Sequence, residues 1–331
     1  QDVLTVLRLS DLSLVKVNEL PEEKSVAGVE WISDERLMFT ATRKLGSYAS
    51  PFLTGEWFAV NADGSQPRPV IFYGTRSAAE RNKTVGNQSF SLLDPLDEDE
   101  RNVLMLAYYQ RSNDGAGVEL VQVDTLSGSR KVLARAPRDN CSLALDEKKQ
   151  ARFAVCSDAR DASGQYDQVT ELYRLGDDGK WSLVNSSKSG GFDLRVLGTT
   201  DDGTIYASRS DRKSPSAFGT LDRQTGEFTE LFRDPVSQVE GWLQSPVDDT
   251  VFGVVTQAGA PKVHMIDEEH ADAQLYLSLA GAFPGQYVRF SSATRDGQKI
   301  IVSVSSDRNP GELYLFDRGT GQARFLMKNR N

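Results

Sequence analysis

Short runs in which apolar and polar residues alternate dominate this chain, and such runs are typical of half-buried β-strands. The clearest example extends from Phe290 to Leu326. Within it, two alternating runs flank Asp296-Gly297 and two more flank Thr320-Gly321. Because Asp-Gly and Thr-Gly pairs supply the positive φ that tight turns need, this segment predicts two β-hairpins in series, or four antiparallel strands.

The third strand of this unit, with the turn residue that follows it, recurs along the chain. The copies are 5–10, 56–61, 119–124, 171–176, 217–222, 262–267 and 312–317. Successive turn positions are 45 to 63 residues apart. Seven four-stranded units at this spacing are typical of a β-propeller, in which similar sheets repeat radially as blades. We therefore predict an all-β fold, a seven-bladed β-propeller of four-stranded antiparallel blades.

The repeat predicts a single propeller domain over residues 1–331, with an incomplete first blade. Its segments Val3 to Leu9 and Ser13 to Val17 match only a third and a fourth strand. The expected blade units are approximately 1–22 (partial), 26–72, 86–135, 140–187, 192–233, 239–285 and 287–328. The missing hairpin is expected to lie upstream of Gln1, or to be replaced by another segment.

One segment shows a helical period instead of alternation. Leu275, Leu279 and Phe283 fall at i, i+4 and i+8, and Pro284-Gly285 follows them. This spacing predicts a short helix over residues 272–283, inserted between the sixth and seventh units.

The two cysteines, Cys141 and Cys156, lie in two expected strands around a polar turn. A turn centred between Lys148 and Lys149 places them opposite each other in an antiparallel pair, close enough for a disulfide. The alternative is a pair of small buried thiols in a reduced protein. A disulfide favours an oxidising compartment, so we expect a periplasmic or secreted protein.

Composition and charge argue against two kinds of partner, nucleic acids and the membrane interior. With 39% hydrophobic and 26% charged residues, the chain has the composition of a water-soluble globular protein. Its net charge is -9 and no stretch is rich in Lys or Arg, which argues against a nucleic-acid partner. Apolar stretches such as Val103 to Tyr109 are far shorter than the roughly 20 residues of a membrane span, so none is expected.

Catalytic patterns are missing from the sequence. No Gly-x-Ser-x-Gly pentapeptide occurs, and only His264 and His270 could act as a histidine base. His264 is expected to be a structural residue of a strand, and His270 lies in a polar turn without the His-Glu-x-x-His order of zinc peptidases. We therefore expect no catalytic residue, no metal and no cofactor in this chain.

Arginines follow the second strand of five units, in polar loops. They are Arg43, Arg111, Arg160, Arg212 and Arg308. Because strand direction alternates within a blade, equivalent loops emerge on one face of a propeller. These arginines are candidates for contact with a carboxylate-bearing ligand or with a partner domain. The alternative is that each arginine braces its loop by pairing with an aspartate.

The last unit carries a family resemblance. The stretch from Ser306 to Asp317, the hairpin from Phe290 to Val302 and the segment Ala-Phe-Pro-Gly-Gln at 282–286 resemble the N-terminal propeller of prolyl oligopeptidase family serine peptidases. The bacterial dipeptidyl and acylaminoacyl peptidase branch is the most similar. The resemblance implies that an α/β-hydrolase domain with serine, aspartate and histidine follows the propeller, which caps the active site and admits short peptides. None of the family's catalytic residues has a counterpart in this chain.

Together these patterns predict a non-catalytic propeller domain of a serine exopeptidase or oligopeptidase. It would control access and select short peptides for a hydrolase domain expected downstream of Asn331. The start at Gln1, directly before a strand, favours a piece of a longer polypeptide. The alternative is a stand-alone periplasmic propeller that binds proteins. A propeller glycosidase or lyase would need carboxylates that converge at the channel mouth, and the sequence places no such pair there.

Overall fold

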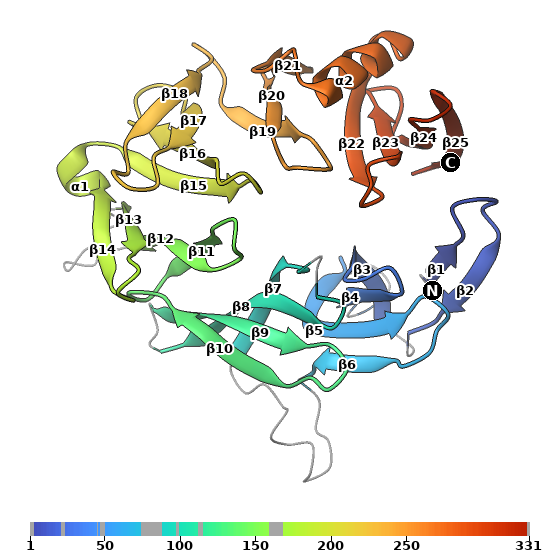
Figure 1. The fold of residues 1–331 in the computed structure, drawn as a ribbon, viewed down its shortest axis with the longest axis horizontal. Helices are drawn as coiled ribbons and strands as arrows, with labels where there is room; N and C mark the ends of the chain where they lie inside the picture. Colours follow the sequence, from blue (N-terminus) through green and yellow to red (C-terminus); the bar gives the residue numbers. More distant parts are fainter. Residues whose placement is uncertain are drawn as a thin grey trace. The chain divides into compact units, whose positions relative to one another are not determined.

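The computed structural model describes residues 3–20, 24–44, 46, 50–73, 88–96, 99–111, 115–158 and 168–329. These residues form an all-β propeller with six clear blades and one partial sheet (Figure 1). By its internal contacts the chain divides into two compact units. The first contains residues 1–143, 154–158 and 175–181, and the second contains residues 144–153, 159–174 and 182–331.

The first unit contains the partial sheet and two complete blades. The partial sheet pairs β1 (Leu4–Leu7) with β2 (Leu14–Asn18). One blade consists of β3 (Lys24–Trp31), β4 (Arg36–Arg43), β5 (Phe52–Asn61) and β6 (Arg68–Ile71), in that order. The next consists of β7 (Gln88–Asp94), β8 (Asn102–Gln110), β9 (Ala116–Asp124) and β10 (Arg130–Arg135). A further blade, with β11 (Cys141–Leu145), β12 (Ala151–Asp158), β13 (Val169–Leu175) and β14 (Trp181–Ser186), contributes residues to both units.

The second unit contains the remaining three blades and both described helices. A one-turn helix, α1 (Ser187–Gly190), precedes β15 (Asp193–Thr199), β16 (Ile205–Ser210), β17 (Ala217–Leu221) and β18 (Phe228–Phe232). The sixth sheet consists of β19 (Val239–Gln244), β20 (Val251–Gln257) and β21 (Pro261–Met265), and α2 (Ala271–Ala282) follows it. The last blade consists of β22 (Tyr287–Ala293), β23 (Lys299–Ser305), β24 (Glu312–Asp317) and β25 (Gln322–Lys328).

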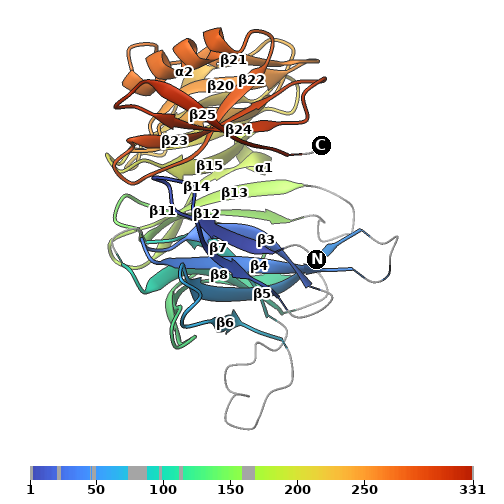
Figure 2. The same ribbon diagram turned by 90° about the vertical axis from the view of Figure 1, so that its right-hand side faces the viewer.

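The prediction of four strands in every complete blade is wrong for the sixth unit, which has three. After β21 the chain forms α2, which confirms the helix predicted over residues 272–283. The His270 side chain accepts a hydrogen bond from the Asp272 backbone amide and so satisfies one of the free N–H groups at the start of the helix. α2 packs against β20 and β22 and lies beside them in both views (Figures 1 and 2). In the sixth unit the chain after β21 thus packs as a helix against β20 and β22 and does not add a fourth strand to the sheet.

Burial falls from the second strand of a blade to the fourth. In β20 every residue before Gln257 is buried, and β8 is buried from Val103 to Ala107. The fourth strands β18 and β25 have no buried residue. The second strands β8 and β20 thus have continuous apolar runs because other residues pack on both of their faces, whereas β23 alternates buried and half-buried positions and the outer strands β18 and β25 face solvent. The last two blades share one apolar core, which contains Phe252 of β20, Val302 of β23 and Tyr276 of α2.

Within the described residues, neither helix is long and apolar enough to cross a membrane.

Candidate functional site

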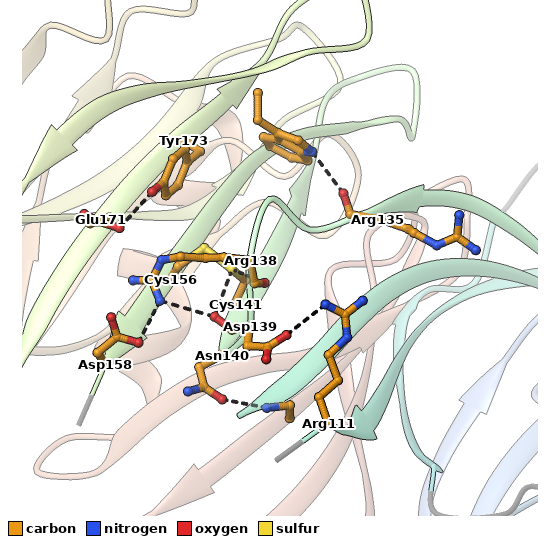
Figure 3. The surroundings of a disulfide bond; sticks show 12 residues. Arg111, Arg135, Arg138, Asp139, Asn140, Cys141, Cys156, Asp158, Glu171 and Tyr173 are labelled. Carbon is orange, nitrogen blue, oxygen red and sulfur yellow. Dashed lines mark hydrogen bonds and ion pairs between the residues drawn. A yellow bond between two sulfur atoms is a disulfide. The ribbon is translucent and has the colours of Figure 1, made fainter. Parts of the chain in front are cut away.

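The predicted cysteine pair forms a disulfide in the structure (Figure 3). Cys141 on β11 and Cys156 on β12 are joined with an S–S distance of 2.02 Å, and both residues are buried. The Ser157 amide donates to the Asn140 carbonyl oxygen at 3.0 Å, so the two strands stay paired beside the disulfide. The Arg138 guanidinium donates to the Asp158 carboxylate at 2.7 Å at the same end of these strands. This region is a structural cross-link and has no free thiol.

Arg111 and Arg212, both candidate arginines, each pair with an aspartate. The Arg212 guanidinium makes a two-point contact with Asp193 at the start of β15, at 2.9 and 3.0 Å, and it also donates to the Gln168 carbonyl oxygen. Burial alone would raise the pKa of Asp193, but the hydrogen bond from Arg212 lowers it below its usual value. Arg111 lies 3.3 Å from Asp139 and donates to the Tyr109 hydroxyl at 2.8 Å. Arg111 and Arg212 thus make the Asp–Arg braces of the structural alternative.

The other three candidate arginines are placed differently. Arg43 is exposed at the end of β4, opposite Lys24 and Phe52 in the strand ladder. Arg308 is exposed in the β23–β24 loop, where its backbone amide donates to the Ser306 hydroxyl at 3.2 Å. Arg160 lies outside the described residues. A ligand-binding role for these five arginines stays a prediction.

Among the cavities of the described residues, the sequence did not predict two that lie beside first strands of the second unit. The larger cavity, about 500 Å³, lies between β19 and β22, and the smaller one, about 200 Å³, lies between β15 and β19. Trp242 and Gln244 line both cavities. Figure 1 shows β15, β19 and β22 at the same edge of their successive sheets. The indole of Trp242 therefore separates two hollows on one side of the second unit.

β-Bulges shape the strands that form these walls. The ladder between β22 and β23 pairs Phe290 with Val302 and then Ser292 with Ile301, so that Ser291 has no partner residue. The register also shifts in β15 between Val196 and Gly198, in β19 between Val239 and Gly241, and in β20 at Phe252. A bulge bends its strand and re-aims side chains, and bulges are common beside binding sites. The bulges explain why exposed residues of neighbouring strands enclose a hollow here.

A chain of hydrogen bonds holds the wall between the cavities. The Trp242 indole N–H donates to Gln244 Oε1 at 2.7 Å, and Gln244 Nε2 donates to Asp249 Oδ1 at 2.9 Å. The Trp242 ring also lies against the Phe218 ring, with centroids 6.4 Å apart. Burial, and then the nearby Asp201 carboxylate, raise the pKa of Asp249 above its usual value. These contacts fix the orientation of Trp242 although 38% of its surface is exposed.

Both histidines are engaged within the fold and line neither cavity. His264 Nε2 lies 2.9 Å from the Thr256 hydroxyl, and its ring packs on Phe232. His270 caps α2 and its Nε2 lies 3.6 Å from the Asp248 carboxylate. Over residues 168–329 and the other described ranges, no group of three or more His, Cys, Asp or Glu side chains is placed to hold a metal ion. The cavities are therefore suited to binding, since their walls combine apolar and polar groups without a histidine base.

Comparison with known proteins shows the fold of this chain but does not assign it to a family. No family model and no curated protein sequence matches the chain.

Among solved structures, puromycin hydrolase matches with a TM-score of 0.52 at 14% identity, over 91% of this chain and 53% of that one. Prolyl oligopeptidase B from Galerina marginata, bound to a 25mer macrocyclization substrate, matches with a TM-score of 0.52 at 10% identity, over 92% and 42%. A structure from a study of two prolyl endopeptidases matches with a TM-score of 0.51 at 12% identity, over 92% and 50%. This chain thus spans about half the length of the proteins that it matches. At this identity the likeness shows the fold alone: a β-propeller similar to the N-terminal propeller of prolyl oligopeptidase family peptidases.

Proposed function

We propose that this chain is the non-catalytic propeller domain of a serine peptidase, and that it selects short peptides for a hydrolase domain outside this sequence. The extent of the structural match carries the proposal. The propeller aligns over 91% of its length with puromycin hydrolase, and that alignment leaves about half of the hydrolase unmatched. The unmatched part of such a protein is where the resemblance in the last blade implies an α/β-hydrolase domain.

The cavities support the choice of short peptides as ligands. Pockets that bind small molecules typically have volumes of about 300 to 1,000 Å³ and apolar walls with a few polar groups. The cavity of about 500 Å³ between β19 and β22 has this size, and its walls combine Trp242 and Phe290 with the hydroxyls of Ser291 and Ser292. A few peptide residues fit such a space and a folded protein does not. Selection by size follows from the rigid sheets that carry these walls.

The disulfide supports a location outside the reducing cytosol. Disulfides persist in the periplasm and in secreted proteins, whereas cytosolic thiols are kept reduced. The Cys141–Cys156 bond is buried and links two adjacent strands. A periplasmic or secreted peptidase is therefore part of the proposal.

The experiment compares this chain with its full reading frame. The chain alone is expected to leave chromogenic dipeptide substrates intact, and the protein from the full frame is expected to hydrolyse them. Replacing the serine of a downstream Gly-x-Ser-x-Gly segment by alanine should abolish that hydrolysis. Turnover by the chain alone that a serine-directed phosphonate blocks contradicts the proposal. A full frame without a hydrolase segment also contradicts it and supports the stand-alone interaction propeller.

A further inference from the structure

Arg289 stands apart from the other charged groups beside the larger cavity. Its side chain is exposed on β22, and it lines the cavity of about 500 Å³ together with Trp242 and Phe290. Among the residues that the structure describes, its guanidinium makes no hydrogen bond or ion pair, and its charge acts only on the nearby Tyr287 hydroxyl, whose pKa it lowers against the larger effect of burial. In a chain with a net charge of -9, a guanidinium without an acidic partner in the wall of a cavity is an available anion site.

The other walls determine which anion fits. Polar and apolar groups share the lining, and its apolar part comes from Trp242, Leu243, Pro246, Phe252, Phe290 and Ala293. Phosphate sites typically gather several cations or backbone amides, whereas this cavity has one guanidinium among its lining residues. A single planar guanidinium matches a carboxylate with two parallel hydrogen bonds. The walls therefore favour a carboxylate attached to an apolar or aromatic group.

Two further groups lie where they could complete the binding of such a ligand. The β-bulge leaves Ser291 without an opposite residue in the strand ladder, two residues after Arg289, and Ser291 is exposed at the cavity wall. The hydrogen bond from Trp242 to Gln244 holds the indole in place from the opposite strand. A preorganised aromatic wall facing a cation loses little conformational freedom when a ligand binds.

We propose that the cavity between β19 and β22 binds the C-terminal carboxylate of a short peptide, with Arg289 as the carboxylate partner and Trp242 as the wall against which the last side chain packs. The choice of a peptide as the occupant rests on the proposed function. The binding of an apolar carboxylate rests on Arg289 and the apolar walls alone.

Calorimetric titration of the chain with matched ligands tests the inference. The ligands are N-acetyl-Ala-Phe with a free carboxylate, the same peptide as its C-terminal amide, and N-acetylphenylalanine. We expect the free acid to bind about tenfold more tightly than the amide, as the loss of a charge-assisted hydrogen bond predicts. R289Q should lower the affinity for the acid to that for the amide. W242A should weaken the binding of both.

R324Q is the matched control because it removes the same charge from an exposed position on β25, the fourth strand of the same sheet, and Arg324 does not line the cavity. It should leave binding unchanged, and circular dichroism should show all three variants folded. Equal affinities for acid and amide, equal losses in R289Q and R324Q, or no binding of any ligand overturn the inference.

The ligands also separate this inference from the proposed function. Dipeptides that bind the chain regardless of their C-terminal charge overturn the carboxylate site and leave peptide selection in place. Binding of N-acetylphenylalanine through Arg289, without binding of any peptide, leaves the carboxylate site in place and contradicts peptide selection.

Discussion

At the residue scale, a buried arginine joins two blades of the first unit. The Arg36 guanidinium donates to the hydroxyl and the carbonyl oxygen of Thr125 at 3.1 and 2.9 Å, and to Asn61 at 2.7 Å. Burial lowers the pKa of Arg36, and the nearby Asp124 partly opposes this effect. R36M would leave these buried acceptors without a donor, so we expect it to lower the free energy of unfolding by about 3 kcal/mol.

Urea unfolding followed by circular dichroism measures this loss. The control is R68M in the same unit, because within the described residues the Arg68 guanidinium makes one hydrogen bond, to the Ser127 carbonyl oxygen at 3.1 Å. It should cost about 1 kcal/mol. Equal losses in the two variants would contradict the bridging role of Arg36.

The residue scale also predicts a pH dependence at Asp124. Burial alone would raise its pKa, but hydrogen bonds from the Arg101 side chain and from the Ser127 and Leu126 amides lower it from 3.8 to about 2. Because the folded pKa lies below the unfolded one, the ionised carboxylate stabilises the fold above pH 4, and this stabilisation is lost as the pH falls toward 2. The difference in unfolding free energy between the native protein and D124N should therefore be largest at pH 5 to 7 and shrink steadily as the pH falls toward 2. A difference that grows on acidification would refute this assignment.

At the scale of elements, α2 provides a matched pair of leucines. Leu279 is 7% exposed in the core of the last two blades, whereas Leu277 is 42% exposed on the other side of the same helix. L279A creates a cavity and should lower the free energy of unfolding by about 2 to 4 kcal/mol. L277A should change it by about 0.5 kcal/mol or less. Similar losses in denaturant unfolding would show that α2 is not an integral part of this core.

The same elements show how far local sequence patterns lead. The alternating runs and their turn residues predicted all seven copies of the third strand, which lie on β1, β5, β9, β13, β17, β21 and β24. The period of Leu275, Leu279 and Phe283 predicted α2. The error in the sixth unit arose because the repeat was extended to a fourth strand where the chain already formed the helix. Local patterns predict strands and helices well because the spacing of apolar residues in a short segment follows which of its side chains are buried.

The cavities could not be predicted in this way, because their walls come from strands that are distant in the sequence. Trp242 and Arg289 meet only through the packing of β19 beside β22, and the bulge at Ser291 appears only in the strand register. The Glu-Gly-Trp-Leu-Gln segment at 240–244 did carry one signal, an aromatic residue at a position where alternation predicts exposure. The loop arginines Arg111 and Arg212 could be recognised from the sequence. Their aspartate partners, Asp139 and Asp193, could be identified only from the structure.

At the scale of the whole molecule, the fold is alike while most residues differ. Puromycin hydrolase matches this chain with a TM-score of 0.52 at 14% identity. A propeller tolerates this divergence because each blade needs only alternating strands, tight turns and an apolar second strand. Function then depends on exposed residues of the first strands and loops, which a shared fold does not determine.

The two compact units give the molecule a further testable property, the local effect of its disulfide. The bond closes a loop across a separation of 15 residues, and a cross-link of that length stabilises a fold by about 3 kcal/mol in the chain-entropy model. C141A/C156A should therefore speed amide hydrogen exchange in β11 and β12, and dithiothreitol should do the same to the native protein under mildly denaturing conditions. The blade β22–β25 lies wholly in the second unit, so its exchange should stay unchanged. Dithiothreitol should have no effect on the double variant, which controls for other actions of the reagent. A uniform rise in exchange across both units would show instead that the chain unfolds as one cooperative body.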